Sequence, residues 1–342
     1  MLHCIQHDGH TKSFVIRDPT TNSPMLRIIF MGTPDFAVPT LESLVAWPGG
    51  QVVAVVTAPD RPAGRGRQLQ ASAVKVAAEA HGLPVLQPTN LKSPEFQVEL
   101  RSYAADLQVV VAFRMLPEAV WNMPRRGSIN IHASLLPQYR GAAPINWALM
   151  HGDHETGVTS FLLRHEIDTG DLIFQDRVAI APDDDFGSLY DKLKTVGAAL
   201  ALRSVEAIVA GTAPNTPQQQ RIDLRPAPKL QKETGRLDFS RPATDLVNWV
   251  RGLSPIPTAF APLPDGRLIK IYRAQALPIE GDAAAAVPGT WASDGRRYLR
   301  VAAANGWLDL LDVQLEGKKR MAVDEFLRGA GPSLGLNITA SA

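Results

Sequence analysis

Cysteine is nearly absent from this sequence, since Cys4 is the only one among 342 residues. A single cysteine cannot form an internal disulfide, and no group of Cys and His residues has the spacing of a zinc site. The sequence also lacks an apolar run of the roughly 18 residues that a membrane-spanning helix needs. Residues 1–24 lack the apolar segment of a secretory signal peptide. We therefore predict a cytoplasmic protein without a metal site and without a membrane partner.

An excess of charge of one sign is lacking as well. The 35 Lys and Arg residues nearly balance the 34 Asp and Glu residues, and the formal net charge is +1. The overall charge therefore indicates no particular class of partner. From Lys229 onward Lys and Arg slightly outnumber Asp and Glu, whereas the opposite holds for the preceding part. This small difference favours a polyanionic partner at the C-terminal part of the chain.

The hydrophobic residues make up 45% of the chain, which is enough for two packed cores. We expect residues 1–24 to be a disordered or loosely packed extension and residues 25–211 to form a first domain. Residues 212–229 are rich in Pro and Gln without a hydrophobic period, which predicts a linker. Residues 230–336 are expected to form a second domain. No exposed apolar helix indicates a partner face, so we expect a monomer.

The first domain alternates short apolar runs with helical patterns. This alternation predicts βαβ units and a mostly parallel sheet with right-handed crossovers. The clearest expected strands cover residues 26–32, 51–57, 106–113 and 128–134. The first junction between strand and helix reads MGTPDF and lacks the GxGxxG pattern, which removes the main support for a dinucleotide-binding dehydrogenase.

The second domain has a different pattern. One helix is expected from the stretch ATDLVNWVRGLS, which Gly252 helps to end. Alternating apolar and polar residues follow, separated by turns rich in Pro, Gly and Asp, at 267–277, 297–304 and 306–315. This pattern predicts a small, mostly-β barrel or half-barrel.

Two polar residues stand at the end of the strand expected at 128–134. Asn130 and His132 are two residues apart, so their side chains project from the same face. The carboxyl ends of strands in an open α/β sheet border the crevice where ligands bind. An amide and an imidazole there can together hold a developing oxyanion, and the imidazole can exchange a proton. A purely structural pair, satisfied by backbone groups, remains an alternative.

Two further segments favour a functional reading of Asn130 and His132. The stretch SLLPQYRGAAP follows His132 and predicts an irregular loop against which a flat ligand could lie. Farther along, Asp168 begins the turn pattern Asp-Thr-Gly-Asp, and its carboxylate could orient His132 or relay a proton. A role for Asp168 as the cap of its own turn remains open.

Together these motifs resemble the 10-formyltetrahydrofolate-dependent formyltransferases. The resemblance rests on Asn130-x-His132, SLLP (134–137), RGAAP (140–144) and IDTG (167–170), and on GTPDFAVPTLESL, PDRPAGRGR, GLPVLQP, RGLSPIP and LEGKKRM. It covers about nine-tenths of the sequence. One departure is Arg114, in AFRMLPEAVW, where many members have Ala-Tyr-Gly followed by an apolar pair.

The resemblance implies a fold, a reaction and a set of residues. It implies a Rossmann-like catalytic domain at 25–211 and an OB-like tRNA-binding barrel at 230–336. The expected donor is 10-formyltetrahydrofolate and the expected acceptor is the amino group of initiator methionyl-tRNA, which places the reaction in translation initiation. The implied catalytic residues are Asn130, His132 and Asp168, and the implied folate-binding residues are Ser134, Leu135, Leu136 and Pro137.

The mechanism that follows needs neither a metal nor a covalent intermediate. The neutral amine of the acceptor attacks the formyl carbon, while Asn130 and His132 donate hydrogen bonds to the oxygen that becomes negative. Asp168 holds the imidazole and passes a proton, through water, toward N10 of the folate.

Two basic segments are candidates for holding the tRNA. Arg61, Arg65 and Arg67 stand in a Gly-rich loop after the second strand, where they suit phosphate and base contacts near the acceptor end. Lys318, Lys319 and Arg320 follow a strand of the second domain and suit phosphates farther down the tRNA. A solvated loop or turn remains an alternative for each cluster, and more so for Lys318, Lys319 and Arg320.

Other functions account for part of the pattern. A formyltransferase acting on a sugar nucleotide or on glycinamide ribonucleotide would use the same three catalytic residues, and so would a hydrolase that releases formate. Neither explains the arginine loop or the second domain. An RNA-binding module without catalysis would not need the three polar residues.

Overall fold

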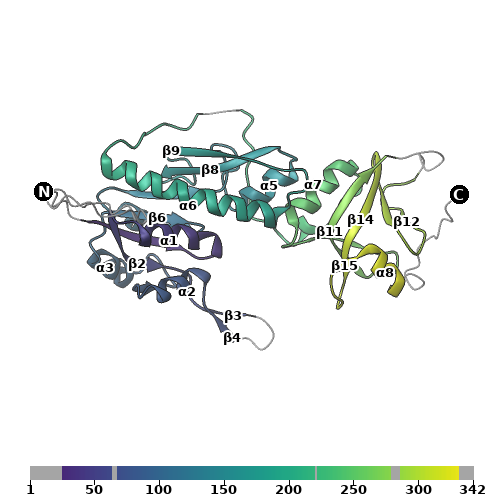
Figure 1. Cartoon of the computed structure of the whole chain (residues 1–342), viewed down its shortest axis with the longest axis horizontal. Coiled ribbons are helices and arrows are strands. Elements are labelled where there is room, and N and C mark those ends of the chain that lie inside the picture. Colours follow the sequence, from purple (N-terminus) through teal and green to yellow (C-terminus); the bar gives the residue numbers. More distant parts are fainter. Residues whose placement is uncertain (1–24, 64–67, 220–221, 279–285, 331–342) are drawn as a thin grey trace, which may run out of the picture.

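The computed structural model describes residues 25–63, 68–219, 222–278 and 286–330. The extension expected at residues 1–24 therefore lies outside the described part. Figure 1 shows two lobes, an N-terminal domain with helices against its sheet and a smaller C-terminal domain dominated by long strands. Within the described residues, no helix is long and apolar enough to cross a membrane.

A seven-stranded sheet forms the N-terminal domain, in the strand order β5-β2-β1-β6-β7-β8-β9. Neighbours are parallel from β5 to β7, whereas β8 and β9 pair antiparallel. The strands are β1 (Leu26–Gly32), β2 (Gly50–Val56), β5 (Val85–Leu86), β6 (Leu107–Val111), β7 (Ser128–His132), β8 (Glu155–Leu162) and β9 (Leu172–Ala179). The predicted mostly parallel α/β sheet is confirmed.

The two faces of this sheet pack into separate hydrophobic cores. Ile28 and Phe30 of β1 belong to one core, and Ile29 and Met31 belong to the other, as the alternation of strand side chains requires. The helical elements are η1 (Asp35–Ala37), α1 (Val38–Ala46), α2 (Ala73–Ala80), α3 (Pro94–Ser102), α4 (Glu118–Trp121), α5 (Pro144–Met150) and α6 (Phe186–Ala210).

The long helix α6 has clear signals at both ends. Asp185 accepts a hydrogen bond from the Ser188 backbone N–H, and the Ser188 hydroxyl accepts one from the Asp185 backbone N–H, which forms a capping box. Gly211 ends the helix in the left-handed conformation, at φ 68°. These caps fix the residues at which α6 begins and ends.

The C-terminal domain contains a six-stranded antiparallel sheet. The strand order is β10-β11-β14-β13-β12, and β15 pairs with β14. The elements are η2 (Glu233–Gly235), α7 (Ala243–Leu253), β10 (Ala259–Pro262), β11 (Leu268–Leu277), β12 (Trp291–Ser293), β13 (Leu299–Ala303), β14 (Gly306–Leu315), β15 (Met321–Ala322) and α8 (Val323–Ala330). The sheet curves as a half-barrel, one of the two forms expected from the sequence.

The two domains meet where α5 packs against α7. The buried Asn146 amide donates a 2.7 Å hydrogen bond to the Gly252 carbonyl oxygen. Met150 of α5 belongs to the hydrophobic core of the C-terminal domain. A Cβ on Gly252 would lie 2.5 Å from Met150 Cγ, so this close approach requires glycine. Arg251 adds hydrogen bonds to the carbonyl oxygens of Ala181 and Asp184.

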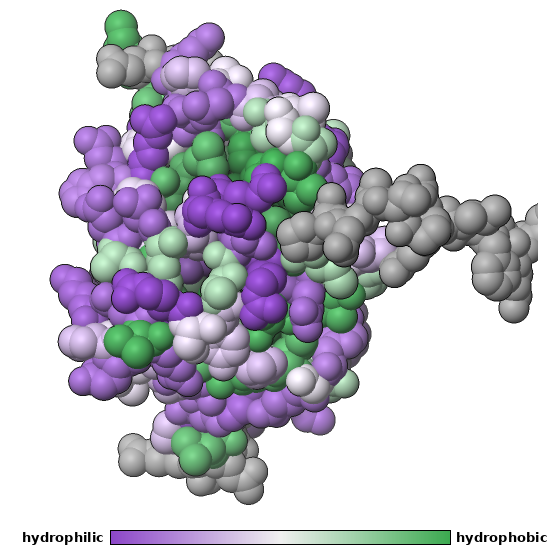
Figure 2. All heavy atoms as spheres, turned by 90° about the vertical axis from the view of Figure 1, so that its left-hand side faces the viewer, coloured by the Kyte–Doolittle hydropathy of each residue, from purple (hydrophilic) through white to green (hydrophobic). Residues whose placement is uncertain are grey.

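A short hairpin projects from the N-terminal domain after β2 (Figure 1). Its strands are β3 (Arg61–Ala63) and β4 (Gln68–Gln70). The sequence had predicted a Gly-rich loop here. Figure 2 views the N-terminal domain from the end farthest from the C-terminal domain, where hydrophilic residues cover most of the face and hydrophobic ones gather in patches between them.

The segment predicted as a linker, 212–229, makes ordered contacts with the N-terminal domain. Thr216 and Leu172 exchange two backbone hydrogen bonds of 2.8 and 3.0 Å. Ala227 donates to the Arg140 carbonyl oxygen and accepts from the Ala142 backbone N–H. We call the described residues 213–219 and 222–228 the strap, because they run along this domain before the chain enters the C-terminal domain.

Candidate active site

Strand β7 places Asn130 and His132 on one face of the sheet, near the carboxyl end of the strand. β7 pairs with β6 in parallel and with β8 antiparallel, where Asn130 is opposite Phe161 and His132 is opposite Thr159. Ile129 and Ile131 alternate with them and pack into the hydrophobic core. The period of two thus separates the apolar residues of β7 from its two polar ones.

A cavity of about 650 Å³ opens at the carboxyl ends of β6 and β7. Its size is typical of small-molecule sites, which span roughly 300–1,000 Å³. Asn130, His132 and Asp168 all line it. Its other walls come from the end of β6 with the loop after it, from residues 141–146, and from residues 163–168. The structure therefore brings the three predicted catalytic residues to one cavity.

Asn130 is half-buried in the cavity wall, and none of the described residues hydrogen-bonds its amide group. A half-buried side-chain amide without a partner among these residues is available to a ligand. Its neighbour on the same face, His132, is 7% exposed.

The imidazole of His132 has a defined tautomer. Its Nε2 lies 2.8 Å from the carbonyl oxygen of Tyr139, which can only accept a hydrogen bond. Nε2 therefore carries a proton and donates it to Tyr139. The other ring nitrogen, Nδ1, faces the cavity side and lies 3.8 Å from Oδ2 of Asp168. Proton exchange with a ligand can therefore occur only at Nδ1.

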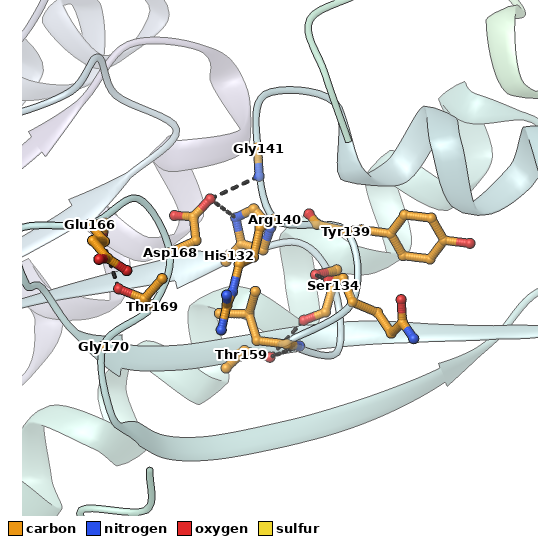
Figure 3. A network of polar contacts seen from close by, with 12 residues as sticks. His132, Ser134, Tyr139, Arg140, Gly141, Thr159, Glu166, Asp168, Thr169 and Gly170 are labelled. Atoms are coloured by element: carbon orange, nitrogen blue, oxygen red, sulfur yellow. Dashed lines mark hydrogen bonds and ion pairs between the residues drawn. The ribbon is translucent and has the colours of Figure 1, made fainter. Parts of the chain in front are cut away.

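Asp168 is held in place by the loop that follows β7. Its Oδ2 accepts a 2.9 Å hydrogen bond from the Gly141 backbone N–H and approaches His132 at the same time, as Figure 3 shows. The residue has a left-handed backbone, with φ 53°, and is 9% exposed. Gly170 follows two residues later, where an added Cβ would lie 1.6 Å from the Leu162 carbonyl oxygen. Only glycine fits this turn.

The predicted folate-binding residues 134–137 support the loop and are not among the cavity-lining residues. Ser134 is fully buried, and its hydroxyl donates to the Gln138 carbonyl oxygen at 2.6 Å. Thr159 donates to the Ser134 carbonyl oxygen and accepts from the Leu136 backbone N–H. In this turn, which is hydrogen-bonded to β8, Ser134 and Leu136 are buried, whereas Leu135 and Pro137 are half-buried. Contact of these four residues with the folate stays a prediction from the sequence.

Arg114, the departure noted in the sequence, lines the cavity and bridges two loops. Its guanidinium donates to the carbonyl oxygens of Pro88 and Thr89. Partial burial, followed by repulsion from the charge of Arg61, lowers the pKa of Arg114. Arg114 therefore places a positive charge at the cavity wall, within electrostatic reach of Arg61.

The predicted tRNA-binding residues differ in their exposure, in their partners and in whether the structure describes them. Arg61 is exposed in β3, whereas Arg65 and Arg67 lie outside the described residues. Lys318 and Lys319 are exposed in the turn between β14 and β15.

Arg320 differs from the other predicted cations because it already has partners within the protein. Its Nε donates to Asp312 at 2.8 Å, and its guanidinium stacks over Tyr272. The hydrogen bond that Arg320 donates to Asp312 raises the pKa of Arg320. The positive charge of Arg320 is therefore partly neutralised, which weakens its attraction for a phosphate relative to that of its two lysine neighbours.

Sequence reasoning missed the groups that hold the three polar side chains. The Gly141 N–H and the Tyr139 carbonyl belong to the backbone, so residue type could not reveal them. Gln218 of the strap donates 2.8 Å hydrogen bonds to the carbonyl oxygens of Asp168 and Gly170. No three His, Cys, Asp or Glu side chains in the described ranges converge as metal ligands.

The arrangement suits addition of a nucleophile to a carbonyl group. It combines an amide donor, an imidazole with one available nitrogen, and a carboxylate beside that nitrogen. Comparison with known proteins defines the class. The formyl transferase family matches residues 26–205, and the formyl transferase C-terminal domain matches residues 229–331.

Relatives place the chain more closely. A protein of Bacteroides fragilis named methionyl-tRNA formyltransferase is 51% identical over 311 residues, which cover 89% of this chain and 95% of the relative. One from Porphyromonas gingivalis with the same name is 47% identical over 311 residues, with the same coverage. The chain belongs to the methionyl-tRNA formyltransferase family.

Solved structures share the fold at lower identity. An N-formyltransferase from Helicobacter canadensis, in complex with folinic acid and dTDP-3-aminofucose, has a TM-score of 0.62 at 18% identity, covering 87% of this chain and 100% of that one. HypX from Aquifex aeolicus, in complex with tetrahydrofolic acid, has a TM-score of 0.56 at 18% identity, covering 91% of this chain and 48% of that one. At this identity the likeness extends to the fold alone.

Proposed function

We propose that this protein transfers a formyl group from 10-formyltetrahydrofolate to the amino group of initiator methionyl-tRNA, for translation initiation. The relatives with this name and the C-terminal half-barrel support the choice of acceptor. The observation that carries the chemistry is that Asn130, His132 and Asp168 line one cavity, with His132 Nδ1 3.8 Å from the Asp168 carboxylate.

The cavity fits the proposed donor. Its walls combine apolar and aromatic side chains, which suit a flat pterin ring, with polar groups near the three catalytic candidates. The apolar residues that would hold the ring are Phe113, Leu116 and Trp121. The 10-formyltetrahydrofolate molecule would supply a formyl group activated by its bond to N10.

Asn130 is proposed to stabilise the oxygen of the formyl group. This oxygen becomes negatively charged when the amine attacks the carbonyl carbon. The amide of Asn130 has no partner among the described residues, so it can donate to that oxygen without losing a bond. One well-placed donor of this kind stabilises a transition state by roughly 3–4 kcal/mol.

His132 is proposed to move the proton. The attacking amine must lose one proton as its bond to carbon forms, and Nδ1 is the ring nitrogen that can take it because Nε2 already donates to Tyr139. The imidazole then becomes positive beside Asp168, whose negative charge stabilises it. The proton can pass from His132, directly or through water near Asp168, to N10 of the folate as the bond between N10 and carbon breaks.

The tRNA is proposed to contact the hairpin β3–β4 and the turn between β14 and β15. Arg61, Lys318 and Lys319 are exposed there and can meet phosphates. Arg65 and Arg67 remain predictions from the sequence, because they lie outside the described residues. Arg320 would add less, since Asp312 already neutralises it.

The test is a transfer assay with purified protein, labelled 10-formyltetrahydrofolate and methionyl-tRNA. We expect rapid formylation of charged initiator tRNA and much slower formylation of elongator methionyl-tRNA, which serves as the control. A dTDP-linked amino sugar is included as a competing acceptor. The proposal is wrong if the sugar nucleotide is formylated efficiently while initiator methionyl-tRNA is not.

A further inference from the structure

We infer that Gln218 is a positioning residue, which holds the carboxylate of Asp168 at its distance from His132. This inference rests on the proposed function, because it assigns Gln218 an effect on the same transfer reaction. Gln218 lies in the strap, outside the motifs that carry the family resemblance, and its hydrogen bonds go to Asp168, Gly170 and Arg140. Its effect is therefore exerted through the backbone of the Asp168 loop.

The Gln218 amide bridges two backbone carbonyl groups of that loop. Its Nε2 donates to the carbonyl oxygens of Asp168 and Gly170, each at 2.8 Å. An amide group has two N–H donors, so both bonds can form at once. Asp168 has a left-handed backbone, with φ 53°, which is costly for a residue other than glycine. The two hydrogen bonds stabilise this conformation, because they form only when both carbonyls face the strap.

Arg140 fixes the orientation of the Gln218 amide. The Arg140 guanidinium donates to Gln218 Oε1 from Nε at 3.2 Å and from Nη2 at 2.6 Å. Because a guanidinium can only donate, the oxygen of the amide must face Arg140 and its nitrogen must face the Asp168 loop. None of the described acidic side chains forms an ion pair with Arg140. The hydrogen bonds of the Arg140 guanidinium among the described residues therefore go to this amide.

The loop after β7 contacts both His132 and Asp168. Arg140 precedes Gly141, whose N–H donates to the Asp168 carboxylate, and follows Tyr139, whose carbonyl accepts from His132. Figure 3 shows Arg140 and Gly141 on the same loop beside His132 and Asp168. The loop after β7 thus holds the side chain of Asp168 directly, and through Gln218 it also holds the backbone of Asp168.

The strap has a register that places Gln218 at this point. Thr216 exchanges two backbone hydrogen bonds with Leu172, at the start of β9. Beyond the segment 220–221, which lies outside the described residues, the Arg225 carbonyl accepts from the Tyr139 N–H at 2.8 Å. Gln218 therefore lies between two anchored positions, and its neighbour Gln219 is exposed.

The experiment compares three single variants in the full chain. Gln218→Leu removes the donors and the acceptor. Gln218→Glu keeps the length and the partner for Arg140 but has no N–H to donate to the two carbonyls. Gln219→Leu is the matched control. We expect kcat for formyl transfer to fall between about tenfold and hundredfold in both Gln218 variants, since a misplacement of about 1 Å can cost that much.

The Michaelis constants separate positioning from binding. The KM for methionyl-tRNA and the KM for 10-formyltetrahydrofolate should stay within about twofold of the wild type, because Gln218 does not line the cavity. Gln219→Leu should leave both kcat and KM unchanged. A wild-type kcat in Gln218→Glu would overturn the inference, and so would a loss confined to KM. If the wild type itself fails to formylate tRNA, the proposed function fails first, which is a different result.

A double-variant cycle then tests whether the effect passes through Asp168. Adding Gln218→Leu to Asp168→Asn should lower kcat by less than about twofold, because the carboxylate that Gln218 positions is already gone. A further loss equal to that of Gln218→Leu alone would show an independent structural effect and would overturn the inference. Thermal unfolding of each variant confirms that the compared proteins are folded.

Discussion

Replacing Asp168 with asparagine tests the electrostatics of the site with little change in shape. The carboxamide oxygen of asparagine can still accept from the Gly141 N–H, so the loop should keep its structure. What is lost is the negative charge 3.8 Å from His132 Nδ1. With an effective dielectric constant of about 20, Coulomb's law gives an attraction of roughly 4 kcal/mol at that distance.

That attraction acts mainly in the transition state, when the imidazole carries the proton of the amine. The side chains of His132 and Asp168 are only 8% and 10% exposed, so screening of their attraction by solvent is limited. Each 1.36 kcal/mol corresponds to a factor of about ten in rate, so the full attraction would be worth about three orders of magnitude. Allowing for partial compensation by water, we expect kcat to fall between about 100-fold and 1,000-fold.

The assay is single-turnover transfer of a labelled formyl group to initiator methionyl-tRNA, with thermal unfolding measured in parallel. Asp171→Asn is the matched control, because Asp171 is in the same loop but pairs with the largely exposed Arg164. An asparagine at 171 can still accept from Arg164, and the charge that is removed is not the one beside His132, so the control should change the rate by less than roughly threefold. A near-normal rate for Asp168→Asn with an intact fold would refute the proposed electrostatic role.

Three further predictions concern the tRNA contacts, the domain interface and acid stability. Arg61→Ala should raise KM for tRNA and lower the slope of log affinity against log salt by about 0.7–0.9. Arg125→Ala should change neither, because Arg125 precedes the amino end of β7, where it pairs with Asp106. Gly252→Ala should destabilise the protein by about 1–3 kcal/mol in urea unfolding, because its new Cβ would overlap α5; Gly329→Ala, which meets nothing within 4 Å, should not. Burial alone would raise the pKa of Asp184, but hydrogen bonds from a lysine, a serine and a backbone N–H outweigh it and lower the pKa below 3.8. This carboxylate therefore stabilises the folded state above about pH 4, and the stability difference between wild type and Asp184→Asn should shrink as the pH falls through the lowered pKa.

The regular elements could be predicted where the sequence pattern was strong. The strands at 26–32 and 306–315 were predicted with the bounds that the structure has. The helix α5 was missed because most of its seven residues are buried, so it has no polar face to reveal a helical period. The hairpin β3–β4 was missed because each strand has only three residues.

The site was predictable only in part. The spacing of Asn130 and His132 was enough to place both on one face of a strand. Their proximity to Asp168, 36 positions after His132, followed from family resemblance and not from spacing. Gln218 stands in a run of three glutamines, and nothing in the sequence distinguishes it from its neighbours. Only the register of the strap against Leu172 selects it.

The short helix α5 belongs to both halves of the molecule. Its first residue, Pro144, borders the reaction cavity, and its last, Met150, is embedded in the core of the C-terminal domain. The close packing of α5 therefore fixes the distance between the cavity and the C-terminal half-barrel. A tRNA must be long enough to reach both the cavity and the half-barrel. A shortened tRNA mimic should therefore contact one of them but not both.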